Sequence, residues 1–272
     1  MLPGINQWAF PAGMATADAI ALAKRIGFSA FEVCLGDKGP TALDITERDA
    51  AALRAYAEKQ GITLYSVASG MGWDYHLTSN DAKNREQAME VTRRVLQVAA
   101  WLGAQAILVV PGVCDAATSY DAALENALEA FRELADTAEK LKVSIGVENV
   151  WNKFLLSPVE MRDFIDQCES EYIGAYFDTG NIMQYGFPEQ WIRILGDRIR
   201  AGHLKDFRRS TGTLDGFVML MEGDVNWPEV MAAFREIDYR GALTAEYMPA
   251  YQHSLDTMLG HLLASEKAIL AL

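Results

Sequence analysis

Four residues that can bind a metal ion each end an apolar run of the chain: Glu148, Asp178, His203 and Glu246. Three carboxylates brought together without a cation would repel one another, and their pKa values would rise. A divalent cation removes that repulsion, and a carboxylate-rich set with one imidazole suits Mn2+, Mg2+ or Co2+, with Zn2+ also acceptable. A single glutamate is usually a solvated surface residue, but four metal-binding residues at equivalent positions predict a site. We expect one divalent ion there, with Mn2+ as the first choice.

These runs belong to a regular alternation of short β-branched apolar segments and longer segments with helical periodicity. Strands are predicted at residues 5–10, 30–34, 63–68, 106–110, 144–148, 173–178, 199–205 and 242–246. Helices are predicted at residues 16–26, 46–60, 81–102, 120–140, 158–168, 189–195, 227–237 and from about 254 to the C-terminus.

The ends of the helical segments carry capping residues. Thr46 precedes Asp49 by three positions, and Ser157 stands before a proline at the first helical position. Three glycines follow helical segments and precede strands, as left-handed C-terminal caps do: Gly27, Gly61 and Gly103. The caps therefore support the alternation.

Eight strand–helix units in 272 residues predict an α/β protein, a (β/α)8 TIM barrel. No glycine-rich dinucleotide fingerprint follows the first strand, which disfavours an open doubly wound sheet. No linker or repeat interrupts the pattern, so we expect residues 1–272 to form one domain. Reacting groups of such barrels stand where the strands end. The four metal-binding residues should therefore meet at one rim.

Charge and composition exclude several classes of protein. The chain has 24 Lys and Arg against 37 Asp and Glu, a formal net charge of −13. A nucleic-acid partner needs a basic face, because phosphate neutralisation supplies most of that affinity. The one compact basic cluster, Lys205, Arg208 and Arg209, is too small for that role. We expect no nucleic-acid partner.

Cysteines and apolar stretches are equally informative. The three cysteines lie far apart and form no CxxC pair, so neither a disulfide framework nor a thiolate zinc site is expected: Cys34, Cys114 and Cys168. The longest apolar stretch, residues 98–113, is interrupted by Gln105 and Pro111 and is too short to span a bilayer. The first residues lack a signal-peptide pattern. We expect a cytoplasmic protein without a membrane partner.

Four motifs resemble the sugar-phosphate isomerase/epimerase superfamily, whose barrel is similar to that of xylose isomerase. They are Val-Glu-Asn-Val-Trp-Asn-Lys-Phe (147–154), Phe-Asp-Thr-Gly-Asn (177–181), Gly-His-Leu-Lys-Asp (202–206) and Thr-Ala-Glu (244–246). Within it, the chain most resembles the L-ribulose-5-phosphate (L-xylulose-5-phosphate) 3-epimerase and ketose 3-epimerase branch. The resemblance implies that the four residues bind one divalent metal ion and that Glu148 and Glu246 are the catalytic acid and base.

The implied reaction is epimerisation of a ketose or ketose phosphate at C3. One glutamate removes the C3 proton to give a cis-enediolate, and the other returns a proton to the opposite face. Alternatives that keep the same residues are a metal-dependent lyase or dehydratase acting on a keto-sugar or keto-inositol, and a 3-epimerase of unphosphorylated ketoses. A barrel that only holds a structural metal is a further alternative, which the paired glutamates disfavour.

Two departures from the free-ketose enzymes favour a phosphorylated substrate. Those enzymes have a histidine where this chain has Asn181, and a glutamate shortly after the motif that here leads into Leu155 and Leu156. In free-ketose epimerases, the arginine six residues after the metal-binding histidine contacts substrate, which implies Arg209. Because arginine binds phosphate with two parallel hydrogen bonds, we expect Arg208 or Arg209 to hold a substrate phosphate.

Further residues are candidates for the pocket. We expect Trp151, Asn181, His76 and Lys205 to contact the small-molecule sugar substrate, with Asn149, Asn181, Lys205 and Asp206 as candidates for orienting the metal ligands. Lys205 could instead pair with Asp206. Aromatic residues that could wall the pocket are Trp8, Phe10, Trp73 and Tyr75. Glu32 has two equal alternatives, a contact to sugar hydroxyls or a buried structural hydrogen bond. Aromatic residues near the outer helices are compatible with a homo-oligomer, whose symmetry the sequence does not fix: Trp191, Trp227 and Tyr251.

Overall fold

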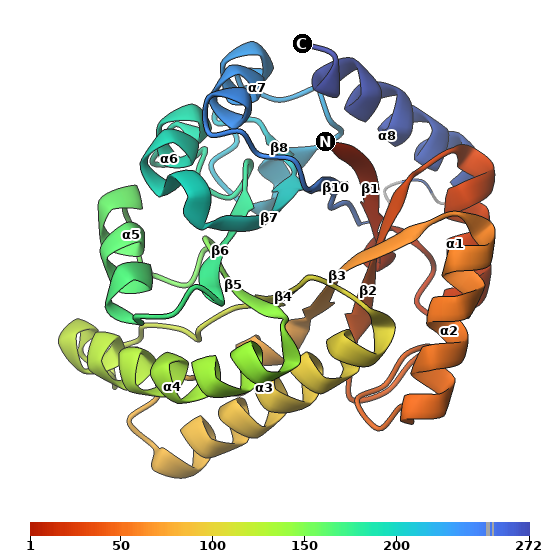
Figure 1. Cartoon of the computed structure of the whole chain (residues 1–272). Coiled ribbons are helices and arrows are strands. Elements are labelled where there is room, and N and C mark those ends of the chain that lie inside the picture. The colour runs from red at the N-terminus through yellow and green to blue at the C-terminus, as the bar shows by residue number, and fades with distance from the viewer. Residues whose placement is uncertain (249–250, 252) are drawn as a thin grey trace.

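Among the residues that the structure describes, eight parallel strands close into a barrel surrounded by eight α-helices (Figure 1). The computed structural model describes residues 1–248, 251 and 253–272. Around the barrel the strand order is β1-β10-β7-β6-β5-β4-β3-β2, and β1 closes the ring by pairing with β10 from Leu2↔Ala242 to Ile5↔Ala245. The barrel strands are β1 (Leu2–Asn6), β2 (Ala30–Leu35), β3 (Thr63–Ser69), β4 (Ala106–Val109), β5 (Ser144–Glu148), β6 (Ile173–Asp178), β7 (Ile199–Leu204) and β10 (Ala242–Ala245). The predicted (β/α)8 barrel is confirmed.

The helices follow the predicted segments closely. They are α1 (Thr16–Ile26), α2 (Glu47–Gln60), α3 (Ala82–Leu102), α4 (Tyr120–Leu141), α5 (Pro158–Gln167), α6 (Pro188–Leu195), α7 (Trp227–Glu236) and α8 (Leu255–Leu270). Thr46 and Ser157 cap α2 and α5 through their side chains, and the three glycines adopt left-handed conformations at the ends of α1, α2 and α3. In the described part of the chain, no helix is both long and apolar enough to cross a membrane.

The first strand is where the sequence prediction was wrong. Residues 5–10 were expected, whereas β1 ends at Asn6 and Gln7–Ala9 form a 3-10 turn, η1. The Asn6 side chain accepts a hydrogen bond from the Trp8 amide at 2.7 Å, which turns the backbone out of the sheet. Trp8 therefore stands beyond the strand, at the end of the barrel where the four predicted metal ligands lie.

Side-chain alternation divides the core into an inner and an outer layer. One face of each strand packs against the helices, while small residues on the other face fill the barrel interior around Tyr176. Gly146 makes room for Tyr176, because a Cβ atom on Gly146 would lie 2.8 Å from the Tyr176 Cβ. Along β6, the inward face that carries Tyr176 also carries Asp178, since strand side chains alternate with a period of two. Alternation thus aims the polar strand ends into the barrel.

Candidate metal centre and active site

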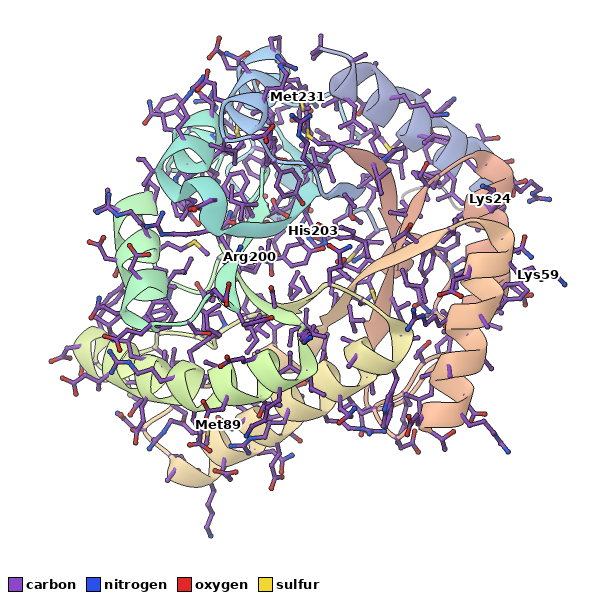
Figure 2. All side chains as sticks on the ribbon, viewed as in Figure 1. Lys24, Lys59, Met89, Arg200, His203 and Met231 are labelled. Atoms are coloured by element: carbon purple, nitrogen blue, oxygen red, sulfur yellow. The ribbon has the colours of Figure 1, made fainter. Side chains whose placement is uncertain are left out.

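The structure brings the four predicted metal ligands together. The cluster of Glu148, Asp178, His203 and Glu246, called the metal cluster below, has one ligand atom from each residue within 4.8 Å of the others. Asp178 and His203 are in register on β6 and β7, and both are completely buried. Figure 2 shows His203 in the middle of the ring of strands. Four adjacent strands, β5, β6, β7 and β10, therefore deliver one ligand each.

Three atoms at the centre of the cluster lack hydrogen bonds in the described structure. They are Asp178 Oδ2, His203 Nδ1 and Glu246 Oε2, all buried. His203 Nδ1 lies 2.9 Å from Glu246 Oε2 and 3.9 Å from Asp178 Oδ2, within ion-pair distance but without hydrogen-bond geometry. Carboxylates that gather in a buried site repel one another. The carboxylates of Asp178, Glu246 and Glu148 and the His203 imidazole gather around one point. This donor set fits a divalent cation.

Glu32 determines which nitrogen of His203 faces the cluster. Its Oε1 lies 2.9 Å from His203 Nε2, which leaves Nδ1 directed at the carboxylates. Glu32 is completely buried in β2 and also accepts hydrogen bonds from Ser66 and Tyr176. Burial would raise the pKa of the Glu32 carboxyl, but the charge on His203 and these hydrogen bonds lower it.

Of the two alternatives for Glu32, the structure therefore shows the buried hydrogen bonds. A carboxylate behind a metal-binding imidazole fixes the orientation of the ring and raises its basicity. The sequence signal for this role was a charged residue in the middle of an otherwise apolar strand.

Two asparagines hold the carboxylate ligands in place. Asn149 exchanges two hydrogen bonds with the backbone of Asp178, each 2.8 Å long. Asn181 donates from Nδ2 to Glu148 Oε1 at 3.2 Å, and its backbone amide donates to Asp178 Oδ1 at 2.8 Å. Trp151 in turn donates from its indole nitrogen to the Asn181 carbonyl at 2.5 Å. Asn149 and Asn181 therefore fix the positions of two predicted metal ligands, Asp178 and Glu148.

Lys205 neutralises part of the negative charge. Its ammonium lies 2.8 Å from Glu246 Oε2 and 3.3 Å from Asp178 Oδ2. Burial would raise the pKa of Glu246, but the positive charges of Lys205 and His203 lower it below its usual range. Burial and the charge of Glu246 raise the pKa of Glu148 to about 8. Opposite shifts in two adjacent carboxyls are typical of an acid and base pair.

Asp206 has a different role from the one considered for it. It does not pair with Lys205; it accepts hydrogen bonds from the backbone amides of Met221 at 2.8 Å and Gly223 at 3.1 Å, and from the Trp227 indole at 3.2 Å. The buried carboxylate thus fixes the segment after β7. This segment contains a short two-stranded sheet, β8 (Asp206–Phe207) and β9 (Phe217–Val218), that the sequence did not reveal.

A cavity of about 830 Å³ opens over the metal cluster. Three of the predicted substrate contacts line it, namely Trp151, Asn181 and Lys205, beside Glu148 and Glu246. Three of the proposed aromatic wall residues, Trp8, Phe10 and Trp73, line it too.

The other candidates are not part of this lining. The His76 ring lies 3.1 Å from the Trp73 carbonyl oxygen. Arg208 donates to the Glu222 carbonyl at 3.0 Å, and Arg209 lies 5.8 Å from the centre of the Phe187 ring; both arginines are exposed. The phosphate contact therefore stays a prediction from the sequence.

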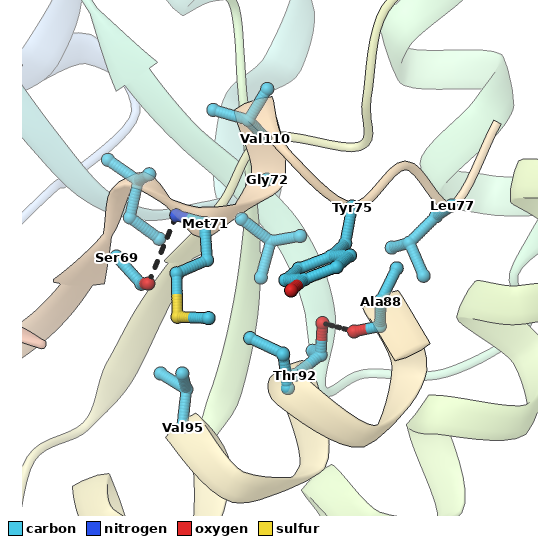
Figure 3. Close-up of a pocket in the computed structure, with 12 residues that line it drawn as sticks. Ser69, Met71, Gly72, Tyr75, Leu77, Ala88, Thr92, Val95 and Val110 are labelled. Atoms are coloured by element: carbon cyan, nitrogen blue, oxygen red, sulfur yellow. Dashed lines mark hydrogen bonds between the residues drawn. The ribbon is translucent and has the colours of Figure 1, made fainter. Parts of the chain in front are cut away.

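Tyr75 packs away from the cavity. The turn after β3 points Met71 and Tyr75 toward α3 residues, including Thr92 and Val95 (Figure 3). The Ser69 hydroxyl accepts a hydrogen bond from the Met71 amide at 3.3 Å, which anchors the start of this turn. Tyr75 therefore supports the turn that carries Trp73.

A family model described as the xylose isomerase-like TIM barrel matches residues 20–261. The chain belongs to this family. The putative L-ribulose-5-phosphate 3-epimerase of Haemophilus influenzae is 24% identical over 253 residues, which cover 89% of this chain and 87% of the relative. A crystal structure of D-psicose 3-epimerase determined with D-fructose has a TM-score of 0.82 and 19% identity, and covers 100% of this chain and 97% of that one. The crystal structure of IOLI protein with a bound zinc atom has a TM-score of 0.84 and 15% identity, and covers 100% of this chain and 98% of that one.

The family membership confirms the resemblance inferred from the four motifs. Relatives with epimerase names match along most of their length, and the barrel brings the predicted metal ligands together. The protein is therefore an enzyme.

Proposed function

We propose that this enzyme is a divalent-metal-dependent sugar epimerase that acts on a ketose by removing and returning the proton at C3. The observation that carries the proposal is the metal cluster, in which three carboxylates and one imidazole each place one ligand atom within 4.8 Å of the others. The printed names of relatives support it, since one is called a 3-epimerase of L-ribulose 5-phosphate and another a 3-epimerase of D-psicose.

Glu148, Asp178, His203 and Glu246 would hold the metal ion, which is Mn2+ by preference. When bound, a divalent cation polarises the substrate carbonyl and stabilises the negative charge that develops as the proton leaves. Asp178 and His203 serve as ligands only. Asn149 and Glu32 keep these two side chains oriented.

Glu148 and Glu246 are the proposed acid and base. Glu148 ends β5 and Glu246 follows β10. These strands flank β6 and β7 in the strand order, so the two glutamates stand on either side of Asp178 and His203. Epimerisation requires removal of a proton from one face of the substrate and delivery to the other, and two carboxyl groups on opposite sides meet that requirement. Lys205 lies against Glu246 and lines the same cavity, so its ammonium would be available to stabilise negative charge that develops on the substrate.

Proton NMR in D2O tests the proposal. Protein loaded with Mg2+, and in parallel protein loaded with Mn2+, is incubated with L-ribulose 5-phosphate, L-ribulose and D-psicose in separate samples. Loss of the C3 proton signal together with growth of the second epimer is the expected result, and chelation with EDTA should stop both. Absence of exchange in all three sugars would overturn the 3-epimerase assignment. Irreversible loss of water would identify the lyase alternative instead.

A further inference from the structure

The cavity over the metal cluster is lined by two chemically different sets of residues. Three of the lining residues are charged: Glu148, Glu246 and Lys205. The apolar part of the lining includes five residues, called the apolar wall below: Trp8, Phe10, Trp73, Leu214 and Met248. They come from separate segments, namely those after β1, β3, β8 and β10.

Three members of the apolar wall are exposed to an unusual degree. Trp73 is 45% exposed, Leu214 is 70% exposed and Met248 is 71% exposed. Large apolar side chains that gather in the open around a concave site mark a ligand-binding surface, because their burial by a ligand removes apolar area from water. The wall therefore has the properties of a subsite that a ligand covers.

We propose that the substrate carries an uncharged apolar substituent, such as an alkyl or aryl group, that lies against the apolar wall while its sugar portion lies at the metal cluster. The inference rests on the proposed function, because that function places the reacting carbons beside Glu148 and Glu246. At the end of the sugar far from these carbons, the inferred substrate has an apolar group and no phosphate.

Charge is the first argument against a phosphate at this position. Lys205 is the one cation among the described residues that line the cavity, and its ammonium is already paired with Glu246 and Asp178. A phosphate dianion against the apolar wall would lose hydration without gaining donors, which is costly. An uncharged apolar group meets no such penalty.

Size is the second argument. The cavity volume of about 830 Å³ falls in the range of roughly 300–1,000 Å³ that encloses drug-sized ligands. A five- or six-carbon sugar is much smaller than such a ligand and would leave the apolar wall uncovered. A sugar with an attached alkyl or aryl group uses the remaining space.

The support beneath Trp73 is the third argument. Met71 and Tyr75 pack toward α3 from the same turn, as Figure 3 shows. Gly72 lies so close to Val110, the residue that follows β4, that a Cβ atom on Gly72 would be 2.5 Å from the Val110 carbonyl oxygen. Trp73 is thus presented by a turn that is already packed. A wall formed in advance binds a rigid apolar group with little ordering cost.

Calorimetric binding of unreactive ligands tests this proposal separately from turnover. The probes are D-arabinitol, D-arabinitol 5-phosphate and 5-O-benzyl-D-arabinitol, titrated into Mg2+-loaded protein. We expect the benzyl ether to bind at least about tenfold more tightly than D-arabinitol. D-arabinitol 5-phosphate should bind no more tightly than D-arabinitol. Trp73→Ala and Leu214→Ala should each remove most of the gain from the benzyl group.

Leu156→Ala is the matched control, since Leu156 is 50% exposed and does not belong to the cavity lining. It should leave all three affinities unchanged, and truncation of exposed side chains should preserve the fold in every variant. Equal affinities for D-arabinitol and its benzyl ether would overturn the apolar subsite while leaving the proposed epimerase intact. Tightest binding of the phosphate, or a dimer that dissociates in Leu214→Ala, would also overturn it. If the protein exchanges no C3 proton but still binds the benzyl ether in a manner that depends on Trp73, the proposed function alone would be overturned.

Discussion

The metal cluster and the apolar wall are built in different ways. The metal cluster is carried by the ends of four adjacent strands, whose pairing register fixes Asp178 beside His203. The apolar wall is carried by turns and loops, and its members differ in exposure from 3% at Phe10 to 71% at Met248. Groups that move protons must be held rigidly, since small displacements slow the reaction greatly. Groups that select a substrate can vary with the loops, so we expect chemistry and selectivity to respond to different substitutions.

The largest effect is expected from Glu246→Gln. The amide keeps the size of the side chain but cannot exchange a proton, so turnover should fall by at least about 100-fold. Steady-state kinetics measures the loss, and circular dichroism checks the fold. Glu125→Gln, which changes an exposed glutamate on α4, is the control and should keep full activity. Residual activity above about one tenth would remove Glu246 from the proton-transfer step.

Glu32→Gln should have the next largest effect. Loss of the carboxylate behind His203 should weaken metal binding or activity by about 10–100-fold. Titration calorimetry with Mn2+ measures the affinity directly. Glu266→Gln is the matched control, because Glu266 is also completely buried but lies between α8 and β1, where its Oε1 accepts a hydrogen bond from the Gly4 amide. Equal losses in the two variants would show that the effect is a general consequence of altering the core.

Glu266→Gln itself should change stability with pH. Burial raises the pKa of Glu266 well above its usual value, although the Gly4 amide and the charge of Lys267 oppose the shift. The folded protein therefore binds more protons than the unfolded chain once the pH exceeds the unfolded pKa, and stability is lost as pH rises toward the folded pKa. Glu266→Gln has no carboxyl group to ionise, so its stability should not fall in this way. Its free energy of unfolding should exceed that of wild type by on the order of 1 kcal/mol at pH 8 and by less at pH 4.5. Urea unfolding at both pH values measures the difference. A gain that is the same at both would contradict the buried-proton explanation.

The smallest effect is expected from Arg209→Ala. Its guanidinium is exposed and stacks near Phe187, outside the cavity lining. The KM values for L-ribulose 5-phosphate and for L-ribulose should each change by less than about twofold, in line with the small effects of substitutions at exposed sites. A selective increase in the KM of the phosphorylated ketose would restore the phosphate contact expected from the sequence. It would also contradict the assignment of selectivity to the apolar wall.

The metal cluster was predictable because each predicted ligand lies at the end of a recognisable strand. Once eight strands and eight helices are recognised, the parallel arrangement forces Glu148, Asp178, His203 and Glu246 to the same rim. The apolar wall was only partly predictable. Trp8, Phe10 and Trp73 were candidates, whereas Leu214 and Met248 gave no signal because an isolated leucine or methionine in a loop does not indicate its neighbours.

Errors in the prediction occurred where side chains redirect the backbone. Asn6 ends the first strand by capping the turn at Trp8, although residues 5–10 have the apolar character of a strand. Asp206 holds the segment after β7 through donors up to 21 positions away, including the Trp227 indole. Local patterns cannot reveal such long-range hydrogen bonds.

The sequence by itself determined the barrel, the helix boundaries to within about two residues and the positions of the four predicted metal ligands at the strand ends, because periodicity and capping are local properties. Tertiary structure alone decided that Glu32 lies behind His203, that Lys205 is paired with Glu246 and Asp178, and that Arg208 and Arg209 lie outside the cavity lining. These facts depend on distances between residues far apart in the chain. Folding sets those distances through the closure of the barrel and the packing of its loops.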